Sequence, residues 1–255
     1  MTAFEEESNP SPFTRPGFLV AAVLVALILI AAVLVVINNS GKSGNSGAGV
    51  STTSAPPPVA TSPTPEPTPA GSRSICGLKG EKVEAARLSK APEVEQWDYQ
   101  GTMAYPTSKA VGPGAKNPAG FRYCFQHTPE GALFTTAYAL AVGSTPEAAR
   151  TWLGYFAPPG RFRDALVSPS AVSSTDAAAQ VRMDIAGFRL LEYTGETARV
   201  DIAVTGASQG VPFTGSYIYN LAWTAGDWRM NTNLSDAFSF AIIPNTAGYV
   251  PWGSG

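Results

Sequence analysis

Histidine, cysteine and carboxylate side chains are the groups of this chain that could carry chemistry, and they are few. There is one histidine, His127, directly before Thr128. A serine-type triad needs a histidine beside a nucleophile, and a multi-histidine metal site needs more than one. The sequence has no GxSxG motif, no phosphate-binding loop and no GxGxxG motif with a following strand. It therefore predicts no catalytic residue, no cofactor and no metal site, with His127 as a loop residue.

Carboxylates remain as candidates for acid–base work, because a carboxylate in an apolar pocket can act as a base. Asp201 alternates with Val200 and Ile202, so we expect its side chain to face away from the core, toward solvent. Asp227 follows a turn signal at Gly226, and we expect it to be a turn residue. An enzyme is thus the third-ranked hypothesis, and its candidates would be Asp184, Glu192, Asp201 and Asp227.

The two cysteines, Cys76 and Cys124, are the only thiols of the chain. Outside the cytoplasm such a pair usually forms a disulfide, and in the chain-entropy model the loop it closes contributes about 4 kcal/mol. The alternative is two unrelated cysteines, with Cys124 simply packed in the core. The spacing contains no CxxC, so neither a redox motif nor a zinc site is indicated.

A transmembrane helix is predicted for residues 17–37, because 18–37 contain no charged or polar side chain. Twenty helical residues rise about 30 Å, roughly the hydrocarbon core of a bilayer. The alternative is a cleaved signal peptide, but the following residues INNSGKSG offer no convincing cleavage site. We therefore expect an uncleaved anchor that follows a short cytoplasmic N-terminus, residues 1–16.

Residues 38–73 predict a disordered stalk rich in Gly, Ser, Pro and Thr, since such a composition cannot bury enough apolar surface to fold. Its part 55–70 holds seven prolines and favours extended polyproline II. The positive-inside count is tied between Arg15 and Lys42. The stalk and the cysteine pair together favour a single-pass protein of the cell membrane with its C-terminal domain extracytoplasmic.

Residues 74–255 have the mixed composition of one folded domain, with 14 Lys and Arg against 15 Asp and Glu. A basic excess, the usual sign of nucleic-acid binding, is absent from this composition, so direct nucleic-acid binding is not expected. Two helix starts are predicted, at Thr128-Pro129-Glu130 and Thr145-Pro146-Glu147, with threonine as the cap. Short helices are also expected near 81–91 and over most of 161–183.

The second half of the domain changes to an alternating pattern that predicts strands joined by short turns. Helices followed by such a meander indicate an α+β fold with helices packed on an antiparallel sheet. FRYCF, residues 121–125, is a further short strand candidate. The four predicted strands of the meander are 187–194, 198–206, 212–224 and 227–231.

An apolar tail follows the last predicted strand, and it must pack somewhere. Its aromatic residues Phe238, Phe240, Tyr249 and Trp252 form a candidate partner interface, because aromatic anchors dominate such contacts. The competing hypothesis, which ranks ahead of the partner contact, is that the tail folds back over its own domain. The aromatic stripe Trp152, Tyr155 and Phe156 is expected to pack in the core, with a binding surface as the alternative.

The segments GFRYCFQHTPEGAL (120–133), AWTAGDWRMN (222–231) and AGYVPWG (247–253) resemble those of membrane-anchored proteins of actinobacterial conjugative elements. The order of anchor, stalk and α+β domain is similar to VirB8 and TcpC-type components of DNA-transfer machines. This resemblance implies an NTF2-like domain, with helices on a strongly bent antiparallel sheet. It brings no catalytic residues, and it implies a scaffold-like, oligomeric role at the cell envelope.

The leading hypothesis is therefore a non-enzymatic, membrane-anchored envelope component of a conjugative or type IV secretion-like apparatus. Its partners would be other subunits of the apparatus or further copies of the same chain. The runner-up is an extracytoplasmic small-ligand-binding or sensor domain that uses the pocket of an NTF2-like cone.

Overall fold

The computed structural model describes residues 73–168, 182–208 and 210–255. The predicted cytoplasmic N-terminus, transmembrane helix and all but the last residue of the stalk lie outside these ranges. So does much of the segment 161–183. Within the ranges described, no helix has the length and apolar character needed to cross a membrane.

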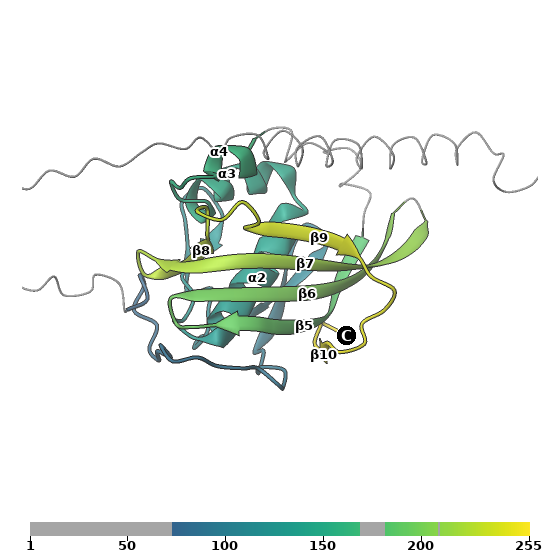
Figure 1. Cartoon of the computed structure of the whole chain (residues 1–255), viewed down its shortest axis with the longest axis horizontal. Coiled ribbons are helices and arrows are strands. Elements are labelled where there is room, and N and C mark those ends of the chain that lie inside the picture. Colours follow the sequence, from purple (N-terminus) through teal and green to yellow (C-terminus); the bar gives the residue numbers. More distant parts are fainter. Residues whose placement is uncertain (1–72, 169–181, 209) are drawn as a thin grey trace, which may run out of the picture. The chain divides into compact units, whose positions relative to one another are not determined.

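The alternating segments form one antiparallel sheet, as the sequence predicts. Its strands run in the order β10-β5-β6-β7-β8, and β9 pairs with β7 beside β8. Figure 1 shows β5 and β10 at one margin of the sheet and β9 at the other. The strands are β5 (Arg182–Tyr193), β6 (Thr197–Ser208), β7 (Val211–Thr224), β8 (Asp227–Met230), β9 (Phe238–Ile242) and β10 (Val250–Pro251).

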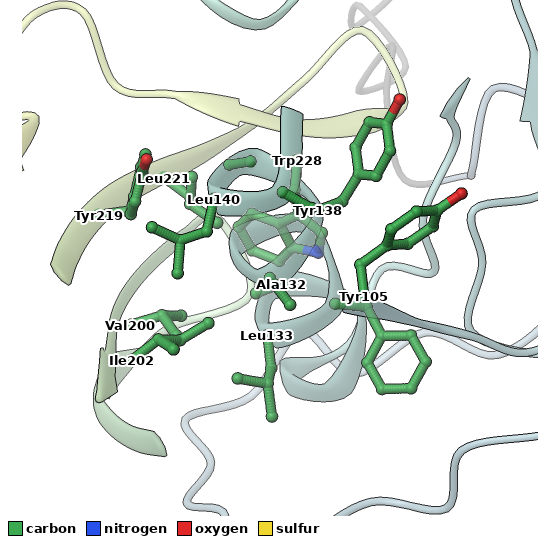
Figure 2. Packing of buried hydrophobic residues seen from close by; sticks show 14 of the residues in the cluster. Tyr105, Ala132, Leu133, Tyr138, Leu140, Val200, Ile202, Tyr219, Leu221 and Trp228 are labelled. Atoms are coloured by element: carbon green, nitrogen blue, oxygen red, sulfur yellow. The ribbon is translucent and has the colours of Figure 1, made fainter. Parts of the chain in front are cut away.

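Helix α2 (Pro129–Gly143) is the centre of the domain. Its N-cap is the predicted one: the Thr128 hydroxyl accepts a hydrogen bond from the Gly131 N–H at 3.2 Å. Nearly every side chain of α2 is buried, as expected for a helix that is apolar on all sides. Figure 2 shows α2 between the β6 side chains Val200 and Ile202 and the ring of Tyr105.

Helices α3 (Pro146–Phe156) and α4 (Arg163–Leu166) complete the helical layer of the described residues. Thr145 occupies the N-cap position of α3, but its side chain makes no capping bond, contrary to the prediction. The aromatic stripe of α3 belongs largely to the core. Trp152 and Phe156 are buried, and their rings stack at 4.0 Å, so this stripe packs inward.

The segment before α2 differs most from the prediction. Residues 81–91 form no helix, and the region expected to be loop contains a hairpin of β1 (Gln96–Gln100) and β2 (Met103–Thr107). The hairpin packs beside α2, where Tyr105 meets Tyr138 with ring centroids 5.0 Å apart. A second, smaller pair joins β3 (Ala115–Lys116) to β4 (Arg122–Tyr123). Within FRYCF only two residues are therefore strand.

The predicted disulfide between Cys76 and Cys124 is present, with the two Cα atoms 6.0 Å apart. It attaches the start of the domain to the segment that leads into α2. The N–H of Ile75 also donates to the carbonyl of Gly226 at 2.8 Å, in the turn between β7 and β8. The N-terminal end of the domain is thus fixed at two points, to the segment before α2 and to the β7–β8 turn of the sheet.

Candidate interaction surface

Strand β9 carries an exposed apolar strip. Phe238, Phe240 and Ile242 are 38%, 47% and 63% exposed, and all five residues of the strand are exposed. Alternate residues of a strand share a face, so these three side chains point to the same side. Natural sheets usually protect an edge strand with a charge, a proline or a bulge, whereas β9 reads FSFAI.

The strip is held in place by aromatic side chains of β7. Phe240 lies opposite Tyr217, with ring centroids 4.7 Å apart, and Phe238 lies opposite Tyr219, at 4.9 Å. Tyr219 is buried and its ring lies 6.2 Å from that of Phe156 in α3. The strip therefore continues the core face of the sheet outward, beyond the part that α3 covers.

The backbone of β9 is also open, along the edge that faces away from β7. The Ile243 N–H donates to Thr214, and Ala237 accepts from the Asn220 N–H, so odd-numbered residues of this segment bond to β7. In an antiparallel pair these bonds alternate, so Phe238, Phe240 and Ile242 direct their N–H and C=O groups away from β7. Among the described residues no strand pairs with that outer edge.

The C-terminal tail, residues 249–252, takes up the opposite margin of the sheet. Val250 and Pro251 pair with Phe188 and Gly187 of β5. Tyr249 lies on the outer face, half-buried, while Trp252 is 7% exposed and packs in the core. Its ring lies 5.2 Å from Trp97, 5.8 Å from Phe134 and 5.6 Å from Phe188.

Two of the four residues proposed as a partner interface are thus used inside the domain. Trp252 is buried because α2, β1 and β5 surround it, so it leaves the candidate surface. Tyr249 packs on β5 and β6 through its hydrogen bonds. The interface candidates that stay exposed are Phe238 and Phe240, joined by Ile242.

Asp201 is fully buried, contrary to the expectation that it would be solvated. It does point away from the helices, as its phase predicts, but the tail and two neighbouring strands cover it. Its carboxylate accepts hydrogen bonds from Arg189 and from the hydroxyls of Ser216 at 2.7 Å and Tyr249 at 2.8 Å. The Arg189 guanidinium also lies 4.1 Å from the centre of the Tyr249 ring. This cluster attaches the tail to the sheet.

Asp227 is also fully buried and organises the disulfide region, which goes beyond the turn position expected for it. Its carboxylate accepts from the N–H groups of Cys124 and Phe125, both at 2.8 Å, and from the Tyr155 hydroxyl at 2.6 Å. Cys124 has φ 72°, a left-handed conformation that costs an L-residue about 1 kcal/mol, and this bond helps to hold it. Burial raises the pKa of the Asp227 carboxyl, while the hydrogen bonds lower it.

His127 lies in the segment between β4 and α2, as the sequence predicts, and its side chain is buried. Its ring stacks on Trp223 with centroids 3.9 Å apart. Nδ1 lies 3.1 Å from a carboxylate oxygen of Glu81 and Nε2 lies 2.5 Å from the carbonyl oxygen of Gly195. The imidazole thus joins the segment before β1 to the turn between β5 and β6.

The other carboxylates named in the sequence do not join these centres. Asp184 and Glu192 lie on β5 and are exposed. In the part of the chain that the structure describes, no three His, Cys, Asp or Glu side chains gather as metal ligands would. Asp201 and Asp227 each use their oxygens to bond protein donors, so the geometry assigns them to structural roles.

A model of a domain of unknown function (DUF8175) matches residues 56–251. The chain belongs to this family. No curated protein and no solved structure matches the chain. The family description names no activity, ligand or partner.

The sequence predicts an aromatic tail but not the division of its residues between core and surface. Phe238, Ser239 and Phe240 show a polar residue between two aromatic ones, and this alternation could have indicated a strand. What the sequence could not show is that β9 pairs with β7, a strand about twenty residues earlier, and has one free edge.

Proposed function

We propose that this protein is a non-enzymatic, membrane-anchored component of the cell envelope that binds protein partners through β9. The observation that carries the proposal is the combination, on one short strand, of three exposed apolar side chains with outward-directed backbone groups. An exposed sheet edge with these properties binds an extended partner strand, because main-chain hydrogen bonds give affinity and alternate side chains give specificity.

The buried polar centres support a binding role over an enzymatic one. Asp227 accepts hydrogen bonds from three backbone N–H groups and one tyrosine hydroxyl. Asp201 is paired with Arg189 and bonded by two hydroxyls. A general base must have an oxygen within reach of a substrate proton. Both carboxylates instead hold parts of the domain together.

We further propose that the domain is NTF2-like and serves a conjugative or type IV secretion-like apparatus. Helices packed on one antiparallel sheet agree with the first part. The second part rests on the similarity of residues 120–133, 222–231 and 247–253 to proteins of actinobacterial conjugative elements. In this proposal the helix 17–37 anchors the chain, the stalk gives reach and β9 contacts the assembly.

A transfer assay on the element that encodes the protein tests the proposal. Deleting the gene should abolish DNA transfer, and the full-length chain should restore it. Phe240→Lys should fail to restore transfer, because a charge in the middle of the strip opposes partner binding. The matched control is Val211→Lys, since Val211 is 66% exposed but lies in the β6–β7 hairpin.

The two parts of the proposal can fail separately in this assay. Unchanged transfer after deletion would end the DNA-transfer role. Transfer that needs the protein but is fully restored by Phe240→Lys would leave the role intact and remove β9 as its binding surface.

A further inference from the structure

We infer that the partner strand at β9 is the β9 of a second copy of this chain, paired antiparallel across a twofold axis at Phe240. The inference rests on the proposed function of β9 as a docking edge. It would join the sheets of two domains into one continuous sheet. Three observations and one prediction support it: the direction of the backbone groups, the side-chain match, the absence of charge on β9 and the predicted membrane tether.

The direction of the backbone groups fixes the possible registers. The groups of Phe238, Phe240 and Ile242 point away from β7, so a partner must place its own outward-pointing residues opposite them. In a second copy those are again the even-numbered residues. Pairing Phe240 with its own equivalent satisfies this condition and uses the whole length of the strand.

The side chains match in the same register. Phe238 of one copy lies opposite Ile242 of the other, so the exposed strip continues across the twofold axis as one apolar surface. Ser239 lies opposite Ala241 on the other face, where both side chains are small. Aromatic and β-branched pairs across strands are stabilising.

The absence of charge on β9 also permits a second copy as the partner. Like charges directly opposite each other destabilise a strand pair, and an identical partner would double any charge on β9. The sequence FSFAI contains none, nor do the next two residues, Ile243 and Pro244. An uncharged edge can pair with itself without electrostatic cost.

The predicted anchor and stalk before the domain favour a second copy over a partner that is not held in the same membrane. Residues 1–72 lie before the described domain and include the predicted anchor and stalk. Its proline-rich part, 55–70, would extend about 3 Å per residue. Copies in one membrane therefore carry β9 at the same range of heights. A pairing of two five-residue strands is small for a stable interface in solution, but confinement to the membrane raises the effective concentration.

Cysteine crosslinking between two tagged full-length chains in membranes tests the register. In the proposed pair Ser239 and Ala241 of different copies are directly opposite, at a non-hydrogen-bonded site with Cα atoms about 4.5 Å apart. A disulfide needs Cα atoms within about 7 Å. Ser239→Cys mixed with Ala241→Cys should crosslink on mild oxidation. Either variant alone should not, since the diagonal separation is about 7 to 8 Å.

The matched control for crosslinking is Thr205→Cys, on the exposed outer face of β6 away from the edge. Mixed with itself or with Ala241→Cys, it should give no dimer. Dimer from Ser239→Cys alone that equals the mixed sample would overturn the proposed register. No dimer in any combination would overturn the inference itself.

Proline substitution separates backbone pairing from apolar contact. The Phe240 N–H points away from β7, so Phe240→Pro removes one outward donor and keeps every bond between β9 and β7. Phe240→Ala removes the ring but keeps the donor. We expect Phe240→Ala to weaken the pair about 30-fold, as a central aromatic anchor does, and Phe240→Pro to abolish it. Equal crosslinking of the mixed Ser239→Cys and Ala241→Cys chains with and without Phe240→Pro would overturn strand pairing.

The transfer assay distinguishes failure of this inference from failure of the proposed function. If the mixed cysteine sample stays monomeric while Phe240→Lys still blocks transfer, the partner is a different protein and β9 remains a docking edge. If the dimer forms and Phe240→Lys abolishes it without changing transfer, the inference stands and the proposed function falls.

Discussion

The two margins of the central sheet are treated in opposite ways. At the β5 margin the chain turns back on itself: Tyr249 lies on the outer face, β10 pairs with the edge, and Trp252 enters the core. At the β9 margin nothing in the described chain covers the edge, and Phe238, Phe240 and Ile242 stay exposed. In Figure 1 these margins are the lower and upper borders of the sheet.

In the function proposed above, this difference separates stability from binding. A domain that leaves both edges open risks uncontrolled strand pairing, and one that closes both has no edge to offer. Here the aromatic residues of the C-terminal segment are divided between the two tasks. Tyr249 and Trp252 help to cover the β5 margin. Phe238 and Phe240 stay exposed at the β9 margin. Substitutions at the two margins should therefore affect different measurements.

Trp252→Ala should produce the largest loss of stability. The side chain is 7% exposed and three aromatic rings surround it, so truncation should cost about 4 kcal/mol. Denaturant unfolding of the detergent-solubilised chain, followed by tryptophan fluorescence, measures this. Phe240→Ala is the matched change at the open margin and should alter stability by less than about 1 kcal/mol. Equal losses would mean that both margins serve the core.

Arg189→Met should produce the second-largest loss of stability. Removing the guanidinium leaves the buried Asp201 carboxylate without its cation, and breaking a buried pair in this way costs about 3 to 5 kcal/mol. Because the side chain of Arg189 is 41% exposed, we expect a smaller loss, about 2 kcal/mol. Arg199→Met, at an exposed position of β6, is the control and should change stability by less than about 0.5 kcal/mol. A change at Arg189 no larger than at Arg199 would show that the cluster does not hold the tail.

Short sequence patterns correctly predicted those helices and strands that depend on neighbouring residues. The Thr-Pro-Glu triplet starts α2 at Pro129, and the alternation of Val200, Ile202 and Val204 marks β6 correctly. The helix expected near 81–91 did not form. That segment is bound instead through the Lys82 N–H to the carbonyl of His127, a contact between residues far apart in sequence.

Burial of polar groups could not be predicted in the same way. The phase of Asp201 was correct, but its cover comes from Tyr249, which lies 48 residues further along the chain. Asp227 likewise meets Cys124, 103 residues earlier. The alternation of apolar and polar residues along a strand predicts to which face of the sheet a side chain points. It does not report what another part of the chain places over that face.

A pair of glycines offers a closer comparison of the two margins. A Cβ on Gly187 would lie 2.8 Å from the Val250 carbonyl oxygen, and one on Gly215 would lie 2.8 Å from a ring carbon of Phe240. The first obstacle is backbone of the paired tail, whereas the second is the end of a side chain at an exposed edge. Gly187→Ala should therefore cost about 1.5 kcal/mol and Gly215→Ala less than half of that, by thermal or denaturant unfolding. A larger loss of stability for Gly215→Ala than for Gly187→Ala would mean that the paired tail moves aside more easily than the ring of Phe240.

The smallest expected effect is a difference in amide hydrogen exchange along the backbone of β9. In dilute detergent, with copies separated, the amide hydrogens of Phe238, Phe240 and Ile242 should exchange about tenfold faster than those of Ser239, Ala241 and Ile243, since only the latter face β7. Residue-resolved hydrogen exchange measures the alternation.

Concentrating the protein in membranes should then slow the three fast amides selectively, because a strand added at the edge bonds those groups and no others. Fast exchange that stays unchanged would leave the edge open but unpaired. Uniform protection along β9 in dilute detergent would mean that this margin is covered within a single chain. The two margins would then no longer differ in the way that makes β9 a binding edge.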